Sequence, residues 1–179
     1  PRPKSRLPGA KAGGATRGIA RAMSRELLAN GWRVSLGCRS TTDAYANVPA
    51  DQALLCHLDA QDPASEQAWA EATRQHFGRI DAIVHNAGLL SRRSVLQASA
   101  DEFDTLFEVN VKSPMRLTQQ VWPDLLAAPQ GKVLVLASLA GKRVRSAESS
   151  LYAMSKFAVL ALAHGLRHCA AGSSVRATA

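Results

Sequence analysis

The feature that most constrains the fold of this chain is a regular alternation of short apolar runs with longer helix-like segments. The runs are nearly continuous in apolar residues, as in KVLVLA, which is typical of parallel strands buried on both faces. The segments between them carry helix-capping residues and an apolar stripe. Repeated strand–helix–strand units predict an α/β fold with a doubly wound parallel sheet and right-handed crossovers. Strands are expected at 33–38, 53–58, 80–85, 132–137 and 174–179, and helices at 15–30, 62–77, 99–128 and 150–171.

The longest expected helix, at 99–128, has a marked beginning and two possible interruptions. Ser99 and Glu102 have the spacing of a capping box, in which each side chain accepts a hydrogen bond from the other residue's backbone. Pro114 and Pro123 fall inside the same segment. Because proline has no N–H and clashes with the preceding turn, we expect them to interrupt or kink this helix.

The positive charge of the chain is concentrated in its first quarter. The 179 residues carry 22 Lys and Arg and 14 Asp and Glu, a net charge of +8, and residues 1–39 account for all of this excess. A basic segment calls for an anionic partner, such as nucleic acid or a phosphate-bearing cofactor, unless it is a solvated face. Trp32 is the only aromatic residue in this segment, so nucleic acid, whose bases stack on aromatic side chains, is not an expected partner.

Other features of the composition exclude further classes. No apolar run reaches the roughly 18–20 residues of a membrane helix, so no membrane partner is expected. The three cysteines, Cys38, Cys56 and Cys169, are odd in number and widely spaced, which argues against a disulfide scaffold and favours a reducing, cytoplasmic location. The five histidines lack the spacing of metal ligands, so no metal site is expected.

A glycine-rich turn, GATRGIA at residues 14–20, precedes the first expected helix. Its glycines let the backbone approach a pyrophosphate, and the helix N-terminus offers free N–H groups, although such a pair of glycines also occurs in ordinary turns. A phosphate-binding turn should follow a buried strand. Residues 6–13, with prolines nearby and hardly any β-branched residue, are expected to make a poor central strand. A single domain is therefore expected at 13–179, after an atypical segment at 1–12.

The second expected strand ends at Arg39 and Ser40. In a dinucleotide-binding fold, an acid at this place binds the ribose 2′-hydroxyl, whereas an arginine accommodates a 2′-phosphate. Arg39, with Arg17 and Ser40, therefore favours NADP(H) over NAD(H). The alternative is that Arg39 is a solvated loop residue.

Tyr152 and Lys156 are four residues apart on an expected helix and so share one face. A lysine ammonium stabilises a neighbouring phenolate, which makes a tyrosine usable as a general acid near neutral pH. The YxxxK spacing alone also occurs by chance on surface helices. Ser138 favours the functional interpretation, because it ends the most strand-like run, at the edge where open α/β sheets bind ligands.

These motifs occur together in the order and spacing of one family. From about Gly13 to Ala179 the chain resembles the short-chain dehydrogenase/reductase family. The similar positions are the turn with Gly14, Thr16, Arg17, Gly18 and Ile19 (TGxxxGIG in the family), then Asp59, the run Asn86, Ala87 and Gly88 (NNAG), Asn110, Ser138, and the pair Tyr152 and Lys156 (YxxxK).

The resemblance implies a Rossmann-like fold and hydride transfer between NADP(H) and a small-molecule carbonyl or alcohol substrate. Ser138 would bind the substrate oxygen, and Tyr152 would exchange a proton with it. Lys156 would assist the tyrosine and hold the nicotinamide ribose, and Asn110 would hold a water that relays protons to Lys156. A homodimer or homotetramer is the expected assembly, by analogy alone.

For the cofactor, the resemblance implies that the turn takes the pyrophosphate, Asp59 lies beside the adenine, and residues 86–88 lie along the adenosine ribose. The chain departs from the family pattern at Ala20, where a third glycine is usual, and at His85, where the family has the first asparagine of NNAG. The family continues beyond the position of Ala179, so the sequence is expected to belong to a longer protein. A non-catalytic dinucleotide-binding or interaction module of the same fold is the alternative.

The substrate itself is not defined by these motifs. The run GKRVR at 141–145 is basic and lies near the expected mouth of the site. It could attract an anionic substrate or an acidic carrier protein, but a solvated loop is the interpretation that we favour.

Overall fold

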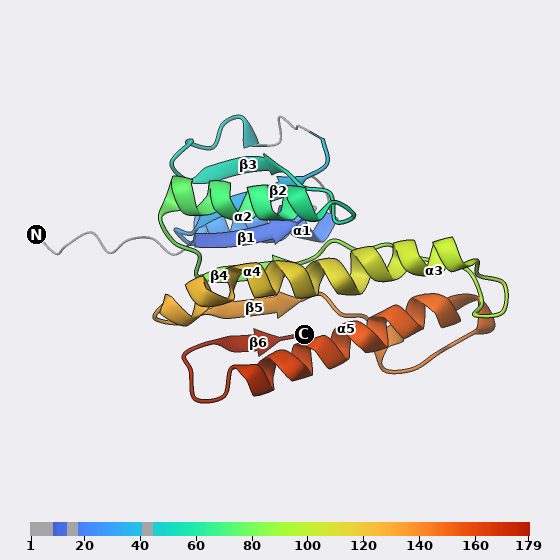
Figure 1. Cartoon of the computed structure of the whole chain (residues 1–179). Helices are drawn as coiled ribbons and strands as arrows, with labels where there is room; N and C mark the ends of the chain where they lie inside the picture. Colours follow the sequence, from blue (N-terminus) through green and yellow to red (C-terminus); the bar gives the residue numbers. More distant parts are fainter. Residues whose placement is uncertain (1–8, 14–17, 41–44) are drawn as a thin grey trace, which may run out of the picture.

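The computed structural model of the chain contains one parallel sheet with helices on both faces (Figure 1). It describes residues 9–13, 18–40 and 45–179. The strands are β1 (Gly9–Gly13), β2 (Arg33–Cys38), β3 (Ala53–His57), β4 (Ala82–His85), β5 (Lys132–Val135) and β6 (Arg176–Thr178). The helices are α1 (Gly18–Ala29), α2 (Pro63–Phe77), α3 (Ala100–Phe107), α4 (Ser113–Ala127) and α5 (Ser150–Cys169). The strand order is β3-β2-β1-β4-β5-β6 with every pair parallel, which confirms the Rossmann-like doubly wound sheet.

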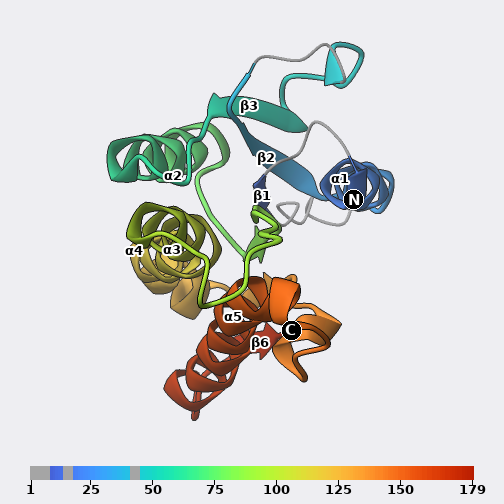
Figure 2. The same cartoon turned by 90° about the vertical axis from the view of Figure 1, so that its right-hand side faces the viewer.

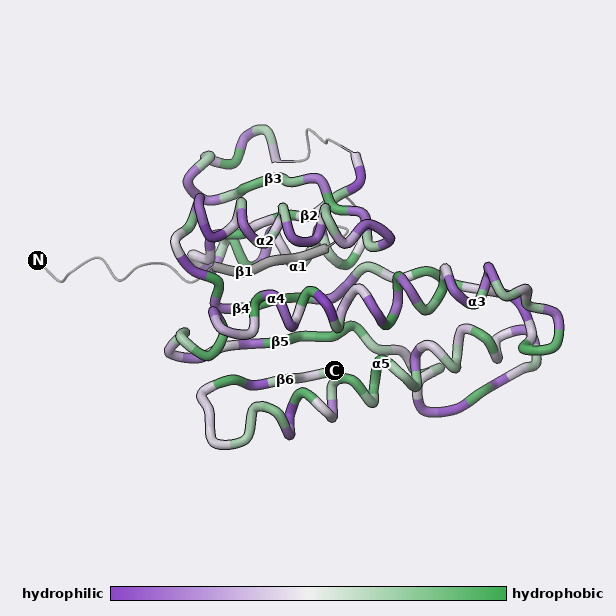
Figure 3. The backbone as a smooth tube through the Cα atoms, viewed as in Figure 1, coloured by the Kyte–Doolittle hydropathy of each residue, from purple (hydrophilic) through white to green (hydrophobic). Residues whose placement is uncertain are grey.

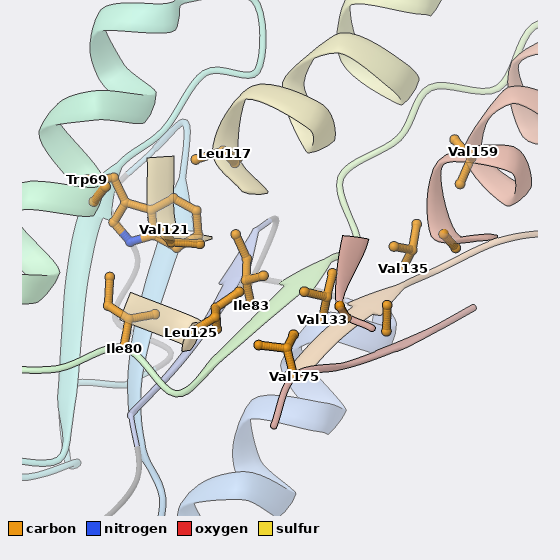
Figure 4. Packing of buried hydrophobic residues seen from close by; sticks show 14 of the residues in the cluster. Trp69, Ile80, Ile83, Leu117, Val121, Leu125, Val133, Val135, Val159 and Val175 are labelled. Atoms are coloured by element: carbon orange, nitrogen blue, oxygen red, sulfur yellow. The ribbon is translucent and has the colours of Figure 1, made fainter. Parts of the chain in front are cut away.

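The main core lies between the sheet and three helices on one face. Viewed toward the carboxyl ends of the strands, α2, α4 and α5 lie on one side of the sheet and α1 on the other (Figure 2). Trp69 of α2, Val121 of α4 and Val159 of α5 pack toward Ile83 and Val133 of the sheet (Figure 4). These five side chains are at most 2% exposed, so this interface excludes water and holds the helices in fixed positions on the sheet.

A second, smaller cluster holds α1 against the opposite face. Val34 and Leu36 of β2 are fully buried and contact Leu27 and Leu28 of α1. The tube in Figure 3 is predominantly hydrophobic along β5 and alternates between hydrophilic and hydrophobic along α2, as expected for a buried strand and for a helix with one solvated side.

The expectation that the residues before the glycine-rich turn make a poor central strand was wrong. Gly9–Gly13 forms β1, which pairs with β2 on one side and β4 on the other, in the middle of the sheet. The expected domain start at residue 13 therefore cuts through a strand. Intrinsic β-propensity is a weak guide where strands on both sides supply backbone partners, because pairing does not require large side chains.

The expected helix at 99–128 consists of three consecutive helical segments. Ser99 and Glu102 form the predicted capping box at the start of α3. A π-helical segment, Glu108–Lys112, then separates α3 from α4. Pro114 lies in the first turn of α4, directly after the π-helical segment. Pro123 lies inside α4 without ending it, so its expected interruption was wrong; it is exposed, and water can satisfy the carbonyl that it leaves unpaired.

Two element ends matter for the site. β5 stops at Val135, two residues before the expected end at 137, so that Ser138 lies in the connection beyond the sheet. α1 begins at Gly18, which has a positive φ of 58° that a residue with a side chain adopts only under strain. Within the described ranges, no helix is both long and apolar enough to cross a membrane.

Candidate functional site

A cleft of about 520 Å³ opens at the carboxyl ends of the strands. Its walls come from the start of α1, the ends of β2, β3 and β4, and the π-helical segment. This is the switch point of the sheet, where β1 and β4 send their connections to opposite faces, and open α/β sheets bind ligands there. The sequence-predicted cofactor residues that line the cleft are Gly18, Ile19, Arg39, Ser40, Asp59, Asn86, Ala87 and Gly88. Gly14, Thr16 and Arg17 lie outside the described residues.

The start of α1 provides one wall of the cleft. Gly18 and Ile19 are the first two residues of α1 and line the cleft, and the first turn of this helix has no acidic residue. The free N–H groups and the positive end of the helix dipole favour an anion at this place. Arg39 and Ser40 are exposed on the neighbouring wall, at the end of β2. A phosphate-bearing ligand therefore fits the charge of this part of the cleft.

The loop after β3 provides the opposite wall and is internally braced. The Asp59 carboxylate accepts from the Gln61 backbone N–H at 3.0 Å. The Ser65 hydroxyl donates to the carbonyl oxygens of Asp59 at 3.0 Å and Asp62 at 2.8 Å. Asp62 in turn caps α2 by accepting from the Ala64 N–H at 2.9 Å. The cap of α2 thus fixes the loop that carries Asp59.

The predicted catalytic pair lies in the first turns of α5. Tyr152 is half-buried, and the Lys156 Nζ lies 5.8 Å from the centre of its ring. Lys156 is 8% exposed and donates to the Leu136 carbonyl oxygen at 3.0 Å. Burial lowers the pKa of the Lys156 ammonium below its usual value, because desolvation disfavours the charged form.

Ser138 is held in the tight turn that leads from β5 toward α5. Its hydroxyl oxygen accepts from the Ala140 N–H at 3.1 Å, at the start of a 3₁₀ turn, Leu139–Gly141. Gly141 packs directly against the backbone of Lys156: a Cβ at residue 141 would lie 2.6 Å from the Lys156 carbonyl oxygen. The turn that carries Ser138 is therefore in contact with the helix that carries the lysine.

Asn110 lies in the π-helical segment, and its buried side chain ties three elements together. Its Nδ2 donates to the Leu89 carbonyl oxygen at 3.0 Å and to the Ser155 Oγ at 2.9 Å, and its Oδ1 accepts from the Leu89 N–H at 2.7 Å. Single π-helical turns inside α-helices are frequent at functional sites. Here the turn delivers an amide between the loop after β4 and the face of α5 next to Lys156.

Two of the predicted catalytic side chains, those of Asn110 and Lys156, lie next to the cleft at Gly88. A Cβ at this position would lie 3.4 Å from the Asn110 Oδ1 and 3.7 Å from the Lys156 Nζ. Gly88 also lines the cleft. One residue of the cleft wall is thus the neighbour of both predicted catalytic groups.

Sequence reasoning missed Ser155 and did not predict what His85 contacts. Ser155 is fully buried, and its hydroxyl oxygen accepts a hydrogen bond from the Asn110 Nδ2. The only indication in the sequence is a small polar residue directly before the lysine of YAMSK. His85, at the departure from NNAG, points away from the cleft, and its Nε2 lies 2.8 Å from the Thr118 Oγ1 of α4. The departure therefore changes sheet-to-helix packing rather than the wall of the cleft. In the described part of the chain, no three metal-binding side chains come together.

A doubly wound sheet with a phosphate-compatible cleft at its switch point, with a buried lysine and an asparagine next to its wall at Gly88, is the arrangement of a dinucleotide-binding fold. The sequence matches the profile of the short chain dehydrogenase family over residues 12–179. The chain therefore belongs to the short-chain dehydrogenase/reductase family.

The similar proteins include several with named activities. The chain is 32% identical over 158 residues to the agropine synthesis reductase of Rhizobium rhizogenes, a match that covers 87% of this chain and 36% of that protein. It is 33% identical over 152 residues to the galactitol 2-dehydrogenase of Agrobacterium fabrum, covering 82% and 58%. A crystal structure of a short-chain dehydrogenase from Streptomyces avermitilis superposes with a TM-score of 0.90 at 28% identity, covering 97% of this chain and 64% of that one. The chain thus spans only part of the length of these proteins.

Proposed function

We propose that this chain forms the cofactor-binding and catalytic part of an NADP(H)-dependent oxidoreductase that interconverts a small-molecule carbonyl and an alcohol. The observation that carries the proposal is the meeting of the cleft with Asn110 and Lys156 at Gly88. A bound nicotinamide dinucleotide would supply the hydride. A binding module without turnover would not need a buried lysine and a tethered asparagine beside its cleft.

The roles of the catalytic side chains follow from their positions. Ser138, beyond the end of β5, would donate a hydrogen bond to the substrate oxygen. Tyr152 would give a proton to that oxygen during reduction and take it back during oxidation. Lys156, buried and anchored on the Leu136 carbonyl, would stabilise the tyrosinate and bind the ribose of the cofactor.

The side-chain amide of Asn110 is already hydrogen-bonded, so we expect the backbone of its segment, and not the amide, to hold the water of the proton relay. Its Nδ2 donates two hydrogen bonds to protein groups, and its Oδ1 already accepts one. A water that relays protons to Lys156 would therefore bind a backbone carbonyl of the π-helical segment, because Pro114 has no N–H to donate to the carbonyl four residues before it.

For the cofactor, Gly14, Thr16, Arg17, Gly18 and Ile19 would surround the pyrophosphate at the start of α1. Asp59 would lie beside the adenine, and Asn86, Ala87 and Gly88 would line the adenosine ribose. Arg39 and Ser40, exposed on the cleft wall, would bind a 2′-phosphate, which is the basis for proposing NADP(H) rather than NAD(H).

The cofactor proposal is tested by titrating the chain with NADPH and with NADH and following cofactor fluorescence. We expect tighter binding of NADPH, and loss of that preference in Arg39→Ala, because the variant removes the cation without changing the rest of the cleft. Arg167→Ala, which removes an arginine on α5 that does not line the cleft, is the matched control. Equal affinity for both cofactors in the unsubstituted chain would refute the preference.

The catalytic proposal is tested with Tyr152→Phe and a panel of ketones and aldehydes. The variant keeps the ring and loses only the hydroxyl, so NADPH affinity should persist while consumption of NADPH with any active carbonyl falls by about 10²-fold or more. Turnover equal to that of the unsubstituted chain would remove Tyr152 from the mechanism. Binding of cofactor without turnover of any substrate would favour the non-catalytic alternative.

We also infer a homodimer or homotetramer in the cytoplasm. The helices that pair in family assemblies correspond to α3–α4 and α5, and they carry exposed apolar side chains, among them Met115 and Phe157. The three cysteines are all free, which suits a reducing compartment. Light scattering of the purified chain tests the assembly: a monomer at micromolar concentration would refute it.

A further inference from the structure

A fully buried carboxylate lies where α2 meets α4. Glu66, in the first turn of α2, is 0% exposed. The guanidinium of Arg116 on α4 donates to both of its oxygens, from Nε to Oε2 at 2.9 Å and from Nη2 to Oε1 at 2.9 Å. A buried carboxylate is tolerated only with such a partner, and this two-point geometry is the strongest that arginine offers.

The same guanidinium reaches two further elements. Its Nη2 donates to the Ala60 carbonyl oxygen at 3.3 Å, in the loop after β3. Its Nη1 donates to the Glu108 carboxylate, the first residue of the π-helical segment. Lys112 pairs with the same carboxylate at 3.2 Å. Only the planar, five-donor arginine head can hold three groups in fixed directions at once.

Two of these contacts bear directly on the cofactor-binding cleft. Ala60 lines the cleft from the loop after β3, and Val109, which follows Glu108, lines it from the π-helical segment. The two walls belong to segments almost fifty residues apart in the sequence, and α2 and α3–α4 lie on the same side of the sheet in Figure 2. Arg116 itself does not line the cleft.

We propose that Arg116 is a positioning residue that sets the spacing between the Asp59–Gln61 wall and the Val109–Asn110 wall of the cleft, so that dinucleotide affinity depends on it. The inference rests on the proposed cofactor function. It goes further by assigning part of the binding affinity to a side chain that has no access to the cofactor.

A second arginine clamp on the same two helices provides a matched control. Arg74 of α2 donates to the Asp124 carboxylate of α4 at 2.8–3.2 Å and to the Gln120 carbonyl oxygen at 2.6 Å. It is thus also a bidentate pair with an additional carbonyl contact. Neither of these partners lines the cleft, nor does Glu71, which pairs with Arg74 at 3.6 Å within α2, so Arg74 joins α2 to α4 without touching a cleft wall.

The test compares Arg116→Met with Arg74→Met by thermal unfolding and by fluorescence titration with NADPH well below the unfolding temperature. Both variants should unfold at a lower temperature. Arg116→Met should raise the Kd for NADPH about tenfold, as when the binding-competent arrangement falls to about a tenth of the population, and Arg74→Met should leave it within about twofold. Equal Kd changes in the two variants, or no change in either, would overturn the inference.

Because Arg116→Met leaves Glu66 buried without a partner, it could fail to fold, and Glu108→Ala covers that case. This variant keeps the buried Glu66–Arg116 pair and cuts the link from Arg116 to the π-helical segment, together with the solvent-facing ion pair between Glu108 and Lys112. It should weaken NADPH binding by about threefold or more with a native circular dichroism spectrum. An unchanged Kd in Glu108→Ala would refute the spacing role. If the unsubstituted chain binds neither NADPH nor NADH, it is the cofactor proposal itself that fails, and the inference falls with it.

Discussion

Gly141→Ala should damage the site through a single added methyl group. Gly141 ends the 3₁₀ turn after Ser138 and packs on α5. A Cβ there would lie 2.6 Å from the carbonyl oxygen and 3.0 Å from the carbonyl carbon of Lys156. Both atoms belong to the helix backbone, so no side-chain rotation relieves the overlap. The turn and the helix must separate.

The size of the effect follows from the overlap. To reach the 3.4 Å at which Cβ contacts become ordinary, the turn must withdraw by about 0.8 Å. Overpacking of this kind costs about 1–3 kcal/mol of unfolding free energy. For a chain of this size, about 2 kcal/mol lowers Tm by about 4–8 °C. Since Ser138 moves with the turn, a displacement near 1 Å should also lower turnover by about 10²-fold.

The assay is thermal unfolding followed by circular dichroism, together with turnover of whichever carbonyl substrate proves active. Gly165→Ala is the matched control, because Gly165 lies on the same helix and a Cβ there would meet nothing within 4 Å. That substitution should raise the unfolding free energy by about 0.5–1 kcal/mol through helix propensity. If Gly141→Ala unfolds at the same temperature as the unsubstituted chain, the proposed contact between the Ser138 turn and α5 is refuted.

Three further changes test the supports of the site. Burial lowers the pKa of Lys156 in the folded chain, so between that value and the ordinary lysine pKa near 10.4 the unfolded chain binds more protons than the folded one. The unfolding free energy of the unsubstituted chain, measured by urea titration, should therefore rise relative to that of Lys156→Met as the pH increases toward 10. A constant difference between the two chains would refute the pKa shift. Ser155→Ala leaves one N–H of the buried Asn110 amide without an acceptor and should cost about 1–3 kcal/mol in the same titrations; a neutral result would refute the bond. Asp62→Ala removes the cap of α2 and should cost about 1 kcal/mol by thermal unfolding, whereas Asp62→Asn, which keeps the acceptor, should cost little.

Most strands of the sheet were predictable because each consists of a run of apolar residues. The exception is the first strand. The β-strand β1 consists of GAKAG, in which no residue favours a strand. Its place is set by backbone pairing along its whole length with β2 and at residues 10–12 with β4, which only the assembled sheet supplies. A local pattern could not have revealed it.

The sequence predicted a set of site residues, several of which line the cleft, but not the contacts that hold them in place. Asn110 was predicted from its motif, but the π-helical turn that contains it was not, and its amide is bonded to residues far away in the sequence, Leu89 and Ser155. Glu66 and Arg116 are fifty residues apart and occupy helix positions that charged residues usually take on the surface. Only the packing of α2 on α4 buries the Glu66 carboxylate and brings Arg116 into contact with segments from both walls of the cleft.

The space at Gly88 explains how the two halves of the site can work as one. A Cβ there would make only a close contact with the Asn110 Oδ1, at 3.4 Å, and an ordinary one with the Lys156 Nζ, at 3.7 Å, so glycine is not required to avoid a severe clash. A methyl group would instead cover the two polar atoms from the side of the cleft. The absence of a side chain therefore keeps the ammonium within reach of a ligand lying along residues 86–88. Because the ammonium is otherwise buried and anchored on the Leu136 carbonyl, the proposed contact between Lys156 and a bound cofactor would have to pass this glycine.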